Sequence, residues 1–364
     1  MENITYLFGA GASSNCLPIY SNFNSRFIEF REFIKSNIHE LGTLKDSERK
    51  LKQAVTFYNE ELKFHTTPDT YAKKLFHTKS KQELNNFKII LIMFFLFEQL
   101  QNFVNQVGTT NLDKQLFDKR YDAFIAALLK PKPGEVEFLE NVTVLTWNYD
   151  LQFEIAYKQY VQKDIHSIQT DLQCYPILKE GFSFRSLKAN NKFSLIHLNG
   201  IAYPNINLTN DLETKIGSFY SDKKELGQFL LKIYDSILTE QEDSAVSNLS
   251  FAWENIDEDY QMRNDYLSRA REVIRKTEIL VINGYSFPIF NRSIDAELIQ
   301  NMKSLKGIYI QDKYAAENIK QIIESFVGHD LKNKIVDLGY YNQFYIPEMF
   351  IKTPPPINLS GMFF

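Results

Sequence analysis

Short, continuous runs of apolar and β-branched residues recur along the chain, separated by longer segments of helical pattern. Such runs, bounded by small or polar residues, are typical of strands buried on both faces of a parallel sheet. They occur at residues 4–8, 142–146, 193–198, 279–283 and 307–310. Helices are predicted at 23–36, 84–107, 121–129, 151–162, 264–276 and 293–303. Strands that alternate with helices predict an α/β fold with a Rossmann-like, doubly wound parallel sheet.

The segment 43–130 interrupts this alternation. It is helical in pattern and strongly charged, and it contains no strand-like alternation. We therefore predict a helical insertion subdomain, which ends where Pro131-Lys132-Pro133-Gly134 breaks the pattern. Residues 1–42 and 131–330 are assigned to the Rossmann-like domain. Residues 331–364 form an aromatic tail, which either docks on a partner or sister subunit or packs against the protein's own core.

Composition narrows the class of protein. With 44% hydrophobic and 24% charged residues in 364, the chain can bury a full globular core. The net charge of −4 argues against a general electrostatic attraction to nucleic acid and leaves open only a local basic patch, so direct binding is not expected. Two cysteines, Cys16 and Cys174, are too few for a four-thiolate zinc site, so no metal is expected. The longest apolar run, 89–97, is far shorter than the roughly 20 residues of a membrane span. With no secretory signal at its start, the chain is predicted to be cytoplasmic and away from membranes.

The first predicted strand leads into the turn Gly9-Ala10-Gly11-Ala12-Ser13. Because neither glycine carries a side chain, the backbone of such a turn can approach a pyrophosphate closely. The turn therefore predicts a nucleotide-binding βα unit. The third glycine of the common dinucleotide fingerprint is missing, with Ser14 or Asn15 in its place. A tight strand-to-helix turn without a ligand would explain the same residues.

Three later strands also end in small or polar residues. These ends are Thr146-Trp147-Asn148-Tyr149-Asp150, His197-Leu198-Asn199-Gly200 and Gly284-Tyr285-Ser286-Phe287-Pro288. In a parallel sheet the carboxyl ends of the strands meet at one edge, where ligands bind. Taken alone, Asn148 and Asp150 are better explained as capping residues of the next helix than as site residues. Residues 286–288 alone could be no more than a turn.

The order and chemistry of these four segments resemble the sirtuin family, and more closely its divergent prokaryotic branch of sirtuin-like NAD hydrolases that act in antiviral defence. The resemblance runs from residue 4 to about residue 312 and rests on short motifs. The Thr-x-Asn-x-Asp strand end is the most specific of them. The resemblance to this family implies that the chain takes NAD as its substrate, cleaves the nicotinamide–ribose bond and depletes cellular NAD. Such cleavage passes through a cation-like ribose, so the site must place a nucleophile and exclude bulk water.

The resemblance implies a role for each strand end. Asn148 would hold the attacking water, and Asp150 would position the nicotinamide amide or orient its neighbours. A second group would contact the rest of NAD. Gly9, Ala10, Gly11 and Ser13 would cradle the diphosphate, Gly284 and Ser286 would lie near the phosphates and the adenine-side ribose, and Gln311 and Asp312 would reach the adenosine end.

The histidine departs from the family pattern, which places a catalytic His directly before Gly. Here Asn199 precedes Gly200, and His197 lies two residues earlier. Residues two apart on a strand point to the same face, so His197 could face the pocket, displaced by about 7 Å. Two roles stay open for His197, as a catalyst and as a structural histidine. Asn199 can hydrogen-bond a ribose hydroxyl but cannot act as a general base near neutral pH.

Deacylation does not fit, because sirtuin deacylases resemble one another in a small four-cysteine zinc module that this chain cannot supply. A defence NAD hydrolase must be silent in the healthy cell, so control by a partner or by assembly is expected. The resemblance implies a homo-oligomer and a protein partner, such as a hexameric ATPase of the DNA-translocase type or an Argonaute-like protein. The alternative is a catalytically weak subunit that binds NAD or ADP-ribose as a sensor or scaffold.

Overall fold

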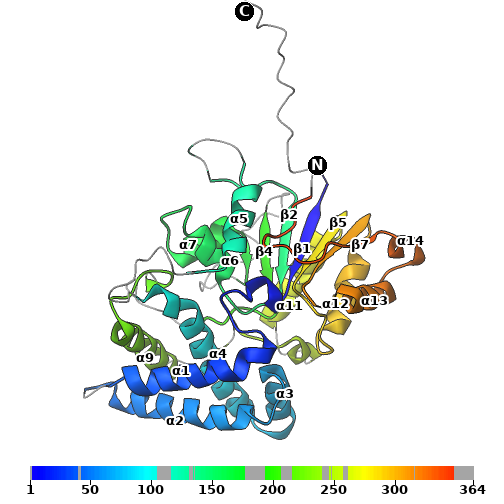
Figure 1. Ribbon diagram of the computed structural model, residues 1–364. Helices are drawn as coiled ribbons and strands as arrows, with labels where there is room; N and C mark the ends of the chain where they lie inside the picture. The colour runs from blue at the N-terminus through cyan, green and yellow to red at the C-terminus, as the bar shows by residue number, and fades with distance from the viewer. Residues whose placement is uncertain are drawn as a thin grey trace, which may run out of the picture.

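A seven-stranded, all-parallel sheet forms the centre of the computed structural model (Figure 1). The structure describes residues 2–39, 42–104, 116–130, 134, 136–176, 193–205, 215–239, 246, 248–256, 261–314 and 316–347. The strands are β1 (Ile4–Phe8), β2 (Val142–Thr146), β3 (Cys174–Tyr175), β4 (Ser194–His197), β5 (Ile279–Asn283), β6 (Gly307–Gln311) and β7 (Ile335–Asp337), in the spatial order β3-β4-β2-β1-β5-β6-β7. This order confirms the predicted α/β, Rossmann-like doubly wound sheet. The short strands β3 and β7 were not predicted.

Helices cover both faces of the sheet. Because side chains alternate along a strand, Tyr6 and Phe8 of β1 face one layer and Leu7 faces the other. The Tyr6 face packs against α5 (Lys119–Leu128), α6 (Gln152–Tyr157) and α7 (Ile165–Asp171). The Leu7 face packs against α11 (Gln261–Ile274), α12 (Arg292–Asn301) and α13 (Ala316–Phe326), after which comes the single turn α14 (His329–Lys332). The sheet is therefore buried on both sides, as its continuous apolar strands require.

A separate body of helices packs around a core of its own. Its members are α1 (Phe23–Asn37), α2 (Lys45–Leu62), α3 (Pro68–Thr78), α4 (Lys81–Leu100) and α9 (Lys223–Thr239). The helix α4 is buried along most of its circumference, and Phe94 and Phe97 contact Phe30 of α1. Short 3-10 helices at Ala10–Ser13, Tyr20–Asn22, Gln101–Phe103 and Ala252–Ile256 connect the larger elements. No described helix is long and apolar enough to cross a bilayer.

The helical body lies beyond the arrowheads of the central strands, at the carboxyl edge of the sheet (Figure 1). Gln99 Oε1 of α4 accepts a hydrogen bond from Leu151 N at 2.5 Å, and Tyr149 donates to Asp69 Oδ1 of α3 at 3.2 Å. The helical body does not coincide with the predicted insertion 43–130. Helices α1 and α9 belong to the body but lie outside this segment, whereas α5 lies within the segment and packs on the sheet. The predicted break at 131–133 and the predicted helical residues 105–107 lie outside the described residues.

The described part of the C-terminal segment packs against the protein itself. Phe344 is buried against Phe8 and Tyr121, with ring centroids 4.9 Å and 5.2 Å away. Tyr345 contacts Tyr309 of β6, whereas Tyr340 and Tyr341 are exposed. Three aromatic residues of the predicted tail, Phe350, Phe363 and Phe364, lie outside the described residues.

Candidate functional site

Two loops at the carboxyl edge of the sheet, after β1 and β5, pack backbone against backbone. Gly9 N donates to Asn283 O at 3.1 Å, and Gly11 N donates to Gly284 O at 2.9 Å. A Cβ atom added to Gly11 would lie 2.7 Å from Gly284 Cα. The glycines of the first turn are therefore needed for this contact, whatever ligand the turn binds.

The close packing leaves only part of the glycine turn open to a ligand. The N–H groups of Gly9 and Gly11 donate hydrogen bonds to backbone oxygens at the end of β5 and just after it. The side chain of Ser13 is buried. Ala10 and Ser14 are exposed at the tip of the turn. A diphosphate at this turn would therefore meet the tip rather than the two glycine N–H groups.

Asn148 connects the end of β2 to the glycine turn. Its Nδ2 donates to Gly9 O at 3.0 Å and to Ser13 Oγ at 3.2 Å. Ser13 Oγ in turn lies 3.0 Å from the hydroxyl of Tyr121 on α5. Asn148 is 8% exposed. The structure thus brings two residues of separate predicted motifs, Ser13 and Asn148, into direct contact.

Asp150 lies in the same buried corner. Its Oδ1 accepts a hydrogen bond from the N–H of Gln152, the first residue of α6, at 3.0 Å, although the N-cap position of this helix is Leu151. Burial raises the pKa of Asp150 to about 6, although the Gln152 amide and the Ser13 hydroxyl act against this rise. A carboxyl group with such a pKa can exchange a proton near neutral pH.

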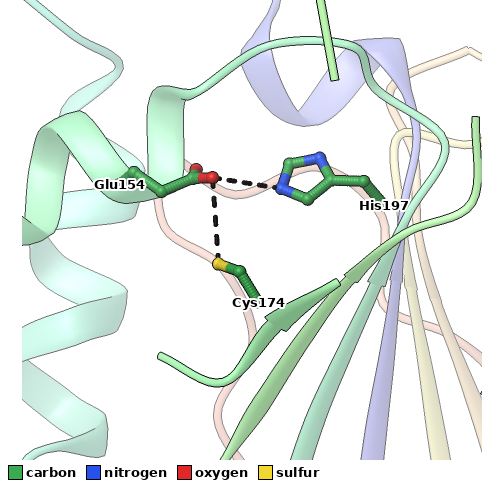
Figure 2. Close-up of side chains that lie close together, drawn as sticks. All are labelled: Glu154, Cys174 and His197. Atoms are coloured by element: carbon green, nitrogen blue, oxygen red, sulfur yellow. Dashed lines mark hydrogen bonds and ion pairs between the residues drawn. The ribbon is translucent and has the colours of Figure 1, made fainter. Parts of the chain in front are cut away.

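His197, at the end of β4, is buried, and Figure 2 shows its ring directed toward Glu154. Its Nδ1 lies 3.3 Å from Asn148 O, and its Nε2 lies 3.2 Å from Glu154 Oε1 of α6. Burial, the largest single effect, would lower the pKa of the imidazole, but the charge and proximity of the Glu154 carboxylate, together with the Asn148 carbonyl and the charge of Asp150, raise it. Nδ1 therefore supports the backbone of Asn148, whereas Nε2 lies at ion-pair distance from Glu154 without hydrogen-bond geometry.

Two further asparagines place amide groups at the carboxyl edge without using all of their hydrogen-bonding capacity. Asn199 Nδ2 donates to Trp147 O at 3.3 Å and to Tyr149 Oη at 3.4 Å, but its Oδ1 has no hydrogen-bond partner among the described residues. Neither side-chain polar atom of Asn283, at the end of β5, has a partner within that same set. Buried amide atoms are normally satisfied, so these atoms keep unused hydrogen-bonding capacity, although both side chains are buried.

The remaining predicted contacts lie along the β5 and β6 side of this edge. Ser286 is exposed, and Gly284 has a φ of +56°. Asp312 is half-buried, and its Oδ1 accepts a hydrogen bond from Tyr314 N at 2.9 Å. The Gln311 side chain, in contrast, is committed to the C-terminal segment. Its Nε2 donates to Gln343 O at 2.6 Å and its Oε1 accepts from Tyr345 N at 3.0 Å.

Sequence reasoning missed the ion pair that holds the glycine turn. Arg120 Nη2 donates to Gly11 O and Ala12 O, both at 3.0 Å, and pairs with Asp118 Oδ2 at 2.5 Å. Asp118 also accepts a hydrogen bond from Asn15 N at 3.3 Å. These two residues belong to the segment predicted as an insertion, so no sequence pattern linked them to the turn.

A second missed network lies behind the strand ends of β2 and β5. Asp295 of α12 accepts hydrogen bonds from Trp147 Nε1 at 2.9 Å and from the Tyr285 hydroxyl at 2.7 Å. Burial raises the pKa of Asp295 to about 8, against the effect of these two donors. The network fixes Trp147 and Tyr285, whose neighbours in sequence, Asn148 and Gly284, belong to the candidate site.

A scan of the sequence against protein-family models gave no match, and a search among curated proteins gave none either. What supports a function for this chain is therefore the chemistry of its own residues.

Proposed function

We propose that this protein is an NAD⁺ hydrolase that cleaves the nicotinamide–ribose bond. The observation that carries the proposal is the meeting of Asn148, Asp150 and Ser13 at the carboxyl edge of a doubly wound sheet. Asn148 Nδ2 bonds to Ser13 Oγ at 3.2 Å, and burial raises the pKa of Asp150 to about 6. An amide that can orient water beside a carboxyl group of near-neutral pKa suits general-base hydrolysis.

In the proposed reaction, a water oxygen forms a bond with the anomeric carbon of the nicotinamide riboside. The bond from that carbon to the ring nitrogen breaks, and nicotinamide leaves with the electron pair. The proton of the attacking water passes to the Asp150 carboxylate and then to solvent. The products are nicotinamide and ADP-ribose. Asn148 fixes the water and the ribose, and burial of the corner limits competing water.

The rest of NAD⁺ is proposed to extend along the carboxyl edge. The exposed tip of the glycine turn, Ala10 and Ser14, supports a diphosphate contact. The unsatisfied Asn199 Oδ1 and the Asn283 amide suit ribose hydroxyls, which can both donate and accept. Ser286 and Asp312 are proposed to contact the adenosine side.

His197 is proposed to act through Asn148 and not on the substrate. Its two ring nitrogens face Asn148 O and the Glu154 carboxylate, and the ring is buried. General-base catalysis by this imidazole would first require both contacts to break. We therefore assign the proton transfer to Asp150.

The proposal is tested by nicotinamide release from NAD⁺, with NAD⁺ binding measured in parallel by calorimetry. The wild type is compared with Asn148→Ala and Asp150→Asn, alone and with candidate partners. Turnover by the wild type that both variants lose by about 10²-fold or more supports the proposal. Folding of the variants is checked by circular dichroism. Absence of both NAD⁺ binding and turnover in the folded wild type overturns it.

A second candidate function is that of a non-catalytic NAD or ADP-ribose sensor or scaffold subunit. The burial of His197, together with the engagement of Asn148 by Gly9 and Ser13, favours it. Under this alternative NAD⁺ binds, Asn148→Ala weakens the binding, and no nicotinamide is released under any condition.

Control of the hydrolase is part of the proposal. We propose a cytoplasmic, homo-oligomeric effector that depletes NAD during antiviral defence and that a protein partner activates. A hexameric ATPase of the DNA-translocase type and an Argonaute-like protein are the two partner classes to be tested. Direct nucleic-acid binding is not proposed, because the chain carries a net charge of −4.

A further inference from the structure

A cluster of three potential metal ligands lies beneath the candidate site. Glu154 of α6, Cys174 of β3 and His197 of β4 point toward one another in Figure 2, and all three are buried. The pairing of β3 with β4 produces this juxtaposition, because Cys174 lies opposite Leu195, two residues before His197 on the same face. The helix α6 packs on that face and supplies the carboxylate.

The spacing of the three ligand atoms suits a small divalent cation. His197 Nε2 lies 3.2 Å from Glu154 Oε1, Cys174 Sγ lies 3.9 Å from the same oxygen, and all three atoms are within 4.8 Å of one another. Tetrahedral zinc with ordinary bond lengths separates nitrogen from oxygen by about 3.4 Å and sulfur from oxygen by about 3.6 Å. The nitrogen–oxygen and sulfur–oxygen distances are therefore within a few tenths of an ångström of zinc geometry, and the nitrogen–sulfur distance, which is within 4.8 Å, would approach about 3.6 Å when the ion binds.

Hydrogen bonds around the cluster orient the ligands as metal sites require. His197 Nδ1 faces Asn148 O at 3.3 Å, which leaves Nε2 to point into the cluster. Gln169 Nε2 donates to Glu154 Oε1 at 3.3 Å. Histidine ligands commonly donate their second ring nitrogen to a carbonyl, and ligating carboxylates are themselves hydrogen-bonded.

The cluster also contains buried polar atoms that the protein does not satisfy. Within the described residues, neither Glu154 Oε2 nor His197 Nε2 has a partner with hydrogen-bond geometry. A divalent cation would bind such atoms, and its charge would balance that of one thiolate and one carboxylate. The buried site would then be electrically neutral, which limits the cost of removing the ion from water.

We propose that Glu154, Cys174 and His197 form a Zn²⁺-binding site that holds β3 and β4 against α6. Binding releases the thiol proton of Cys174 to solvent, because the thiolate is the ligand. Water or another small ligand occupies the fourth position. This site is independent of the proposed NAD⁺ hydrolysis, although His197 connects it physically to Asn148.

The prediction of no metal rested on the absence of a four-cysteine module. Here one cysteine joins a histidine and a glutamate across three separate elements. The intervals between positions 154, 174 and 197 match no short ligand motif. Only the packing of the sheet against α6 brings the three side chains together.

The test is metal binding by the intact chain, measured without NAD. Zinc content is determined by mass spectrometry of the purified protein and of metal-free protein after Zn²⁺ is added back. Co²⁺ then replaces Zn²⁺, since a thiolate ligand gives it an ultraviolet charge-transfer band. Cys174→Ser removes the proposed sulfur ligand, and Cys16→Ser is the matched control because Cys16 lies outside the cluster.

The wild type and Cys16→Ser are expected to bind about one equivalent of Zn²⁺ and to show the thiolate–Co²⁺ band. Cys174→Ser should lose the band and bind Zn²⁺ about tenfold or more weakly. Wild-type protein that is folded by circular dichroism but binds neither metal would overturn the proposal. A Co²⁺ band that persists in Cys174→Ser would also overturn it. Because no outcome depends on NAD, failure here and failure of the proposed hydrolysis are distinguishable.

Discussion

Gly11 and Gly284 pack backbone against backbone between the loops that follow β1 and β5. A Cβ on Gly284 would lie 2.5 Å from the backbone carbon of Gly11, and Gly284 itself has a φ of +56°. Alanine at 284 should therefore meet two penalties, a left-handed backbone conformation and a steric overlap.

We expect Gly284→Ala to lower the free energy of unfolding by about 2–5 kcal/mol, as measured by urea denaturation. Gly339→Ala is the matched control, because Gly339 has a φ of +69° but a Cβ at this position would have no neighbour within 4 Å. The control should lose only about 1–2 kcal/mol of stability, which is the cost of placing alanine in a left-handed backbone conformation. Equal losses in the two variants would contradict the backbone contact.

Asp150→Asn separates catalysis from the hydrogen bond that Asp150 makes to the start of α6. Asn retains the oxygen that accepts the Gln152 N–H, so this hydrogen bond should persist and stability should change little. The variant cannot accept a proton, so nicotinamide release should fall by about 10²- to 10⁴-fold. Asp164→Asn is the control, since Asp164 also accepts a hydrogen bond from a backbone N–H at the start of a helix, Ser167 N of α7 at 2.9 Å, but lies outside the candidate site. Full activity in Asp150→Asn would exclude Asp150 as the base.

Asp295 should make stability fall as the pH rises. Its pKa in the folded protein is about 8, against an ordinary value of 3.8. Between these values the folded state holds a proton that the unfolded state has lost, so the free energy of unfolding decreases with increasing pH. The loss of stability contributed by Asp295 should approach about 6 kcal/mol across the full interval.

Asp295→Asn cannot ionise and should remove this contribution. The measurement is thermal unfolding from pH 5 to pH 8, with the variant compared with the wild type at each pH. The stability difference should shift in favour of the variant as the pH rises. A difference that stays constant over this range would show that Asp295 is ionised in the folded protein throughout.

Phe344 and Tyr341 should respond differently to truncation. Phe344 is 5% exposed among aromatic rings of the sheet layer, and Phe344→Ala should cost about 3–5 kcal/mol of stability. Tyr341 is 61% exposed, and Tyr341→Ala should change stability by no more than about 0.5 kcal/mol. A small effect for Phe344→Ala would mean that the segment around it contributes little to the fold.

The sequence was informative about the sheet because each long strand is a continuous apolar run. It did not reveal β3 and β7, since two or three residues are too few to form a pattern. It predicted where helices form but not which elements they pack against, because a helical period indicates a buried face without indicating what covers that face. Thus α5 contacts β1, whereas α1 packs among the helices of the other body.

The candidate site was predictable where it depends on strand ends. The rule for parallel sheets brought Asn148 to the glycine turn, and the structure places its amide 3.0 Å from Gly9 O. The environment of His197 was not predictable, because it depends on Glu154, which no motif connected to the histidine. Arg120 was missed for the same reason, since its contact with Gly11 O spans 109 residues of sequence.

The position of β1 at the centre of the sheet has a consequence for biosynthesis. Ile4 pairs with Val142 on one side and with Ile279 on the other. At a translation rate of about 5–20 residues per second, β5 leaves the ribosome on the order of tens of seconds after β1. During that interval Ile4–Phe8 is an apolar segment that lacks at least one of its two sheet neighbours, which is the kind of segment that chaperones bind. Translation speed and chaperone supply should therefore govern the yield of this protein.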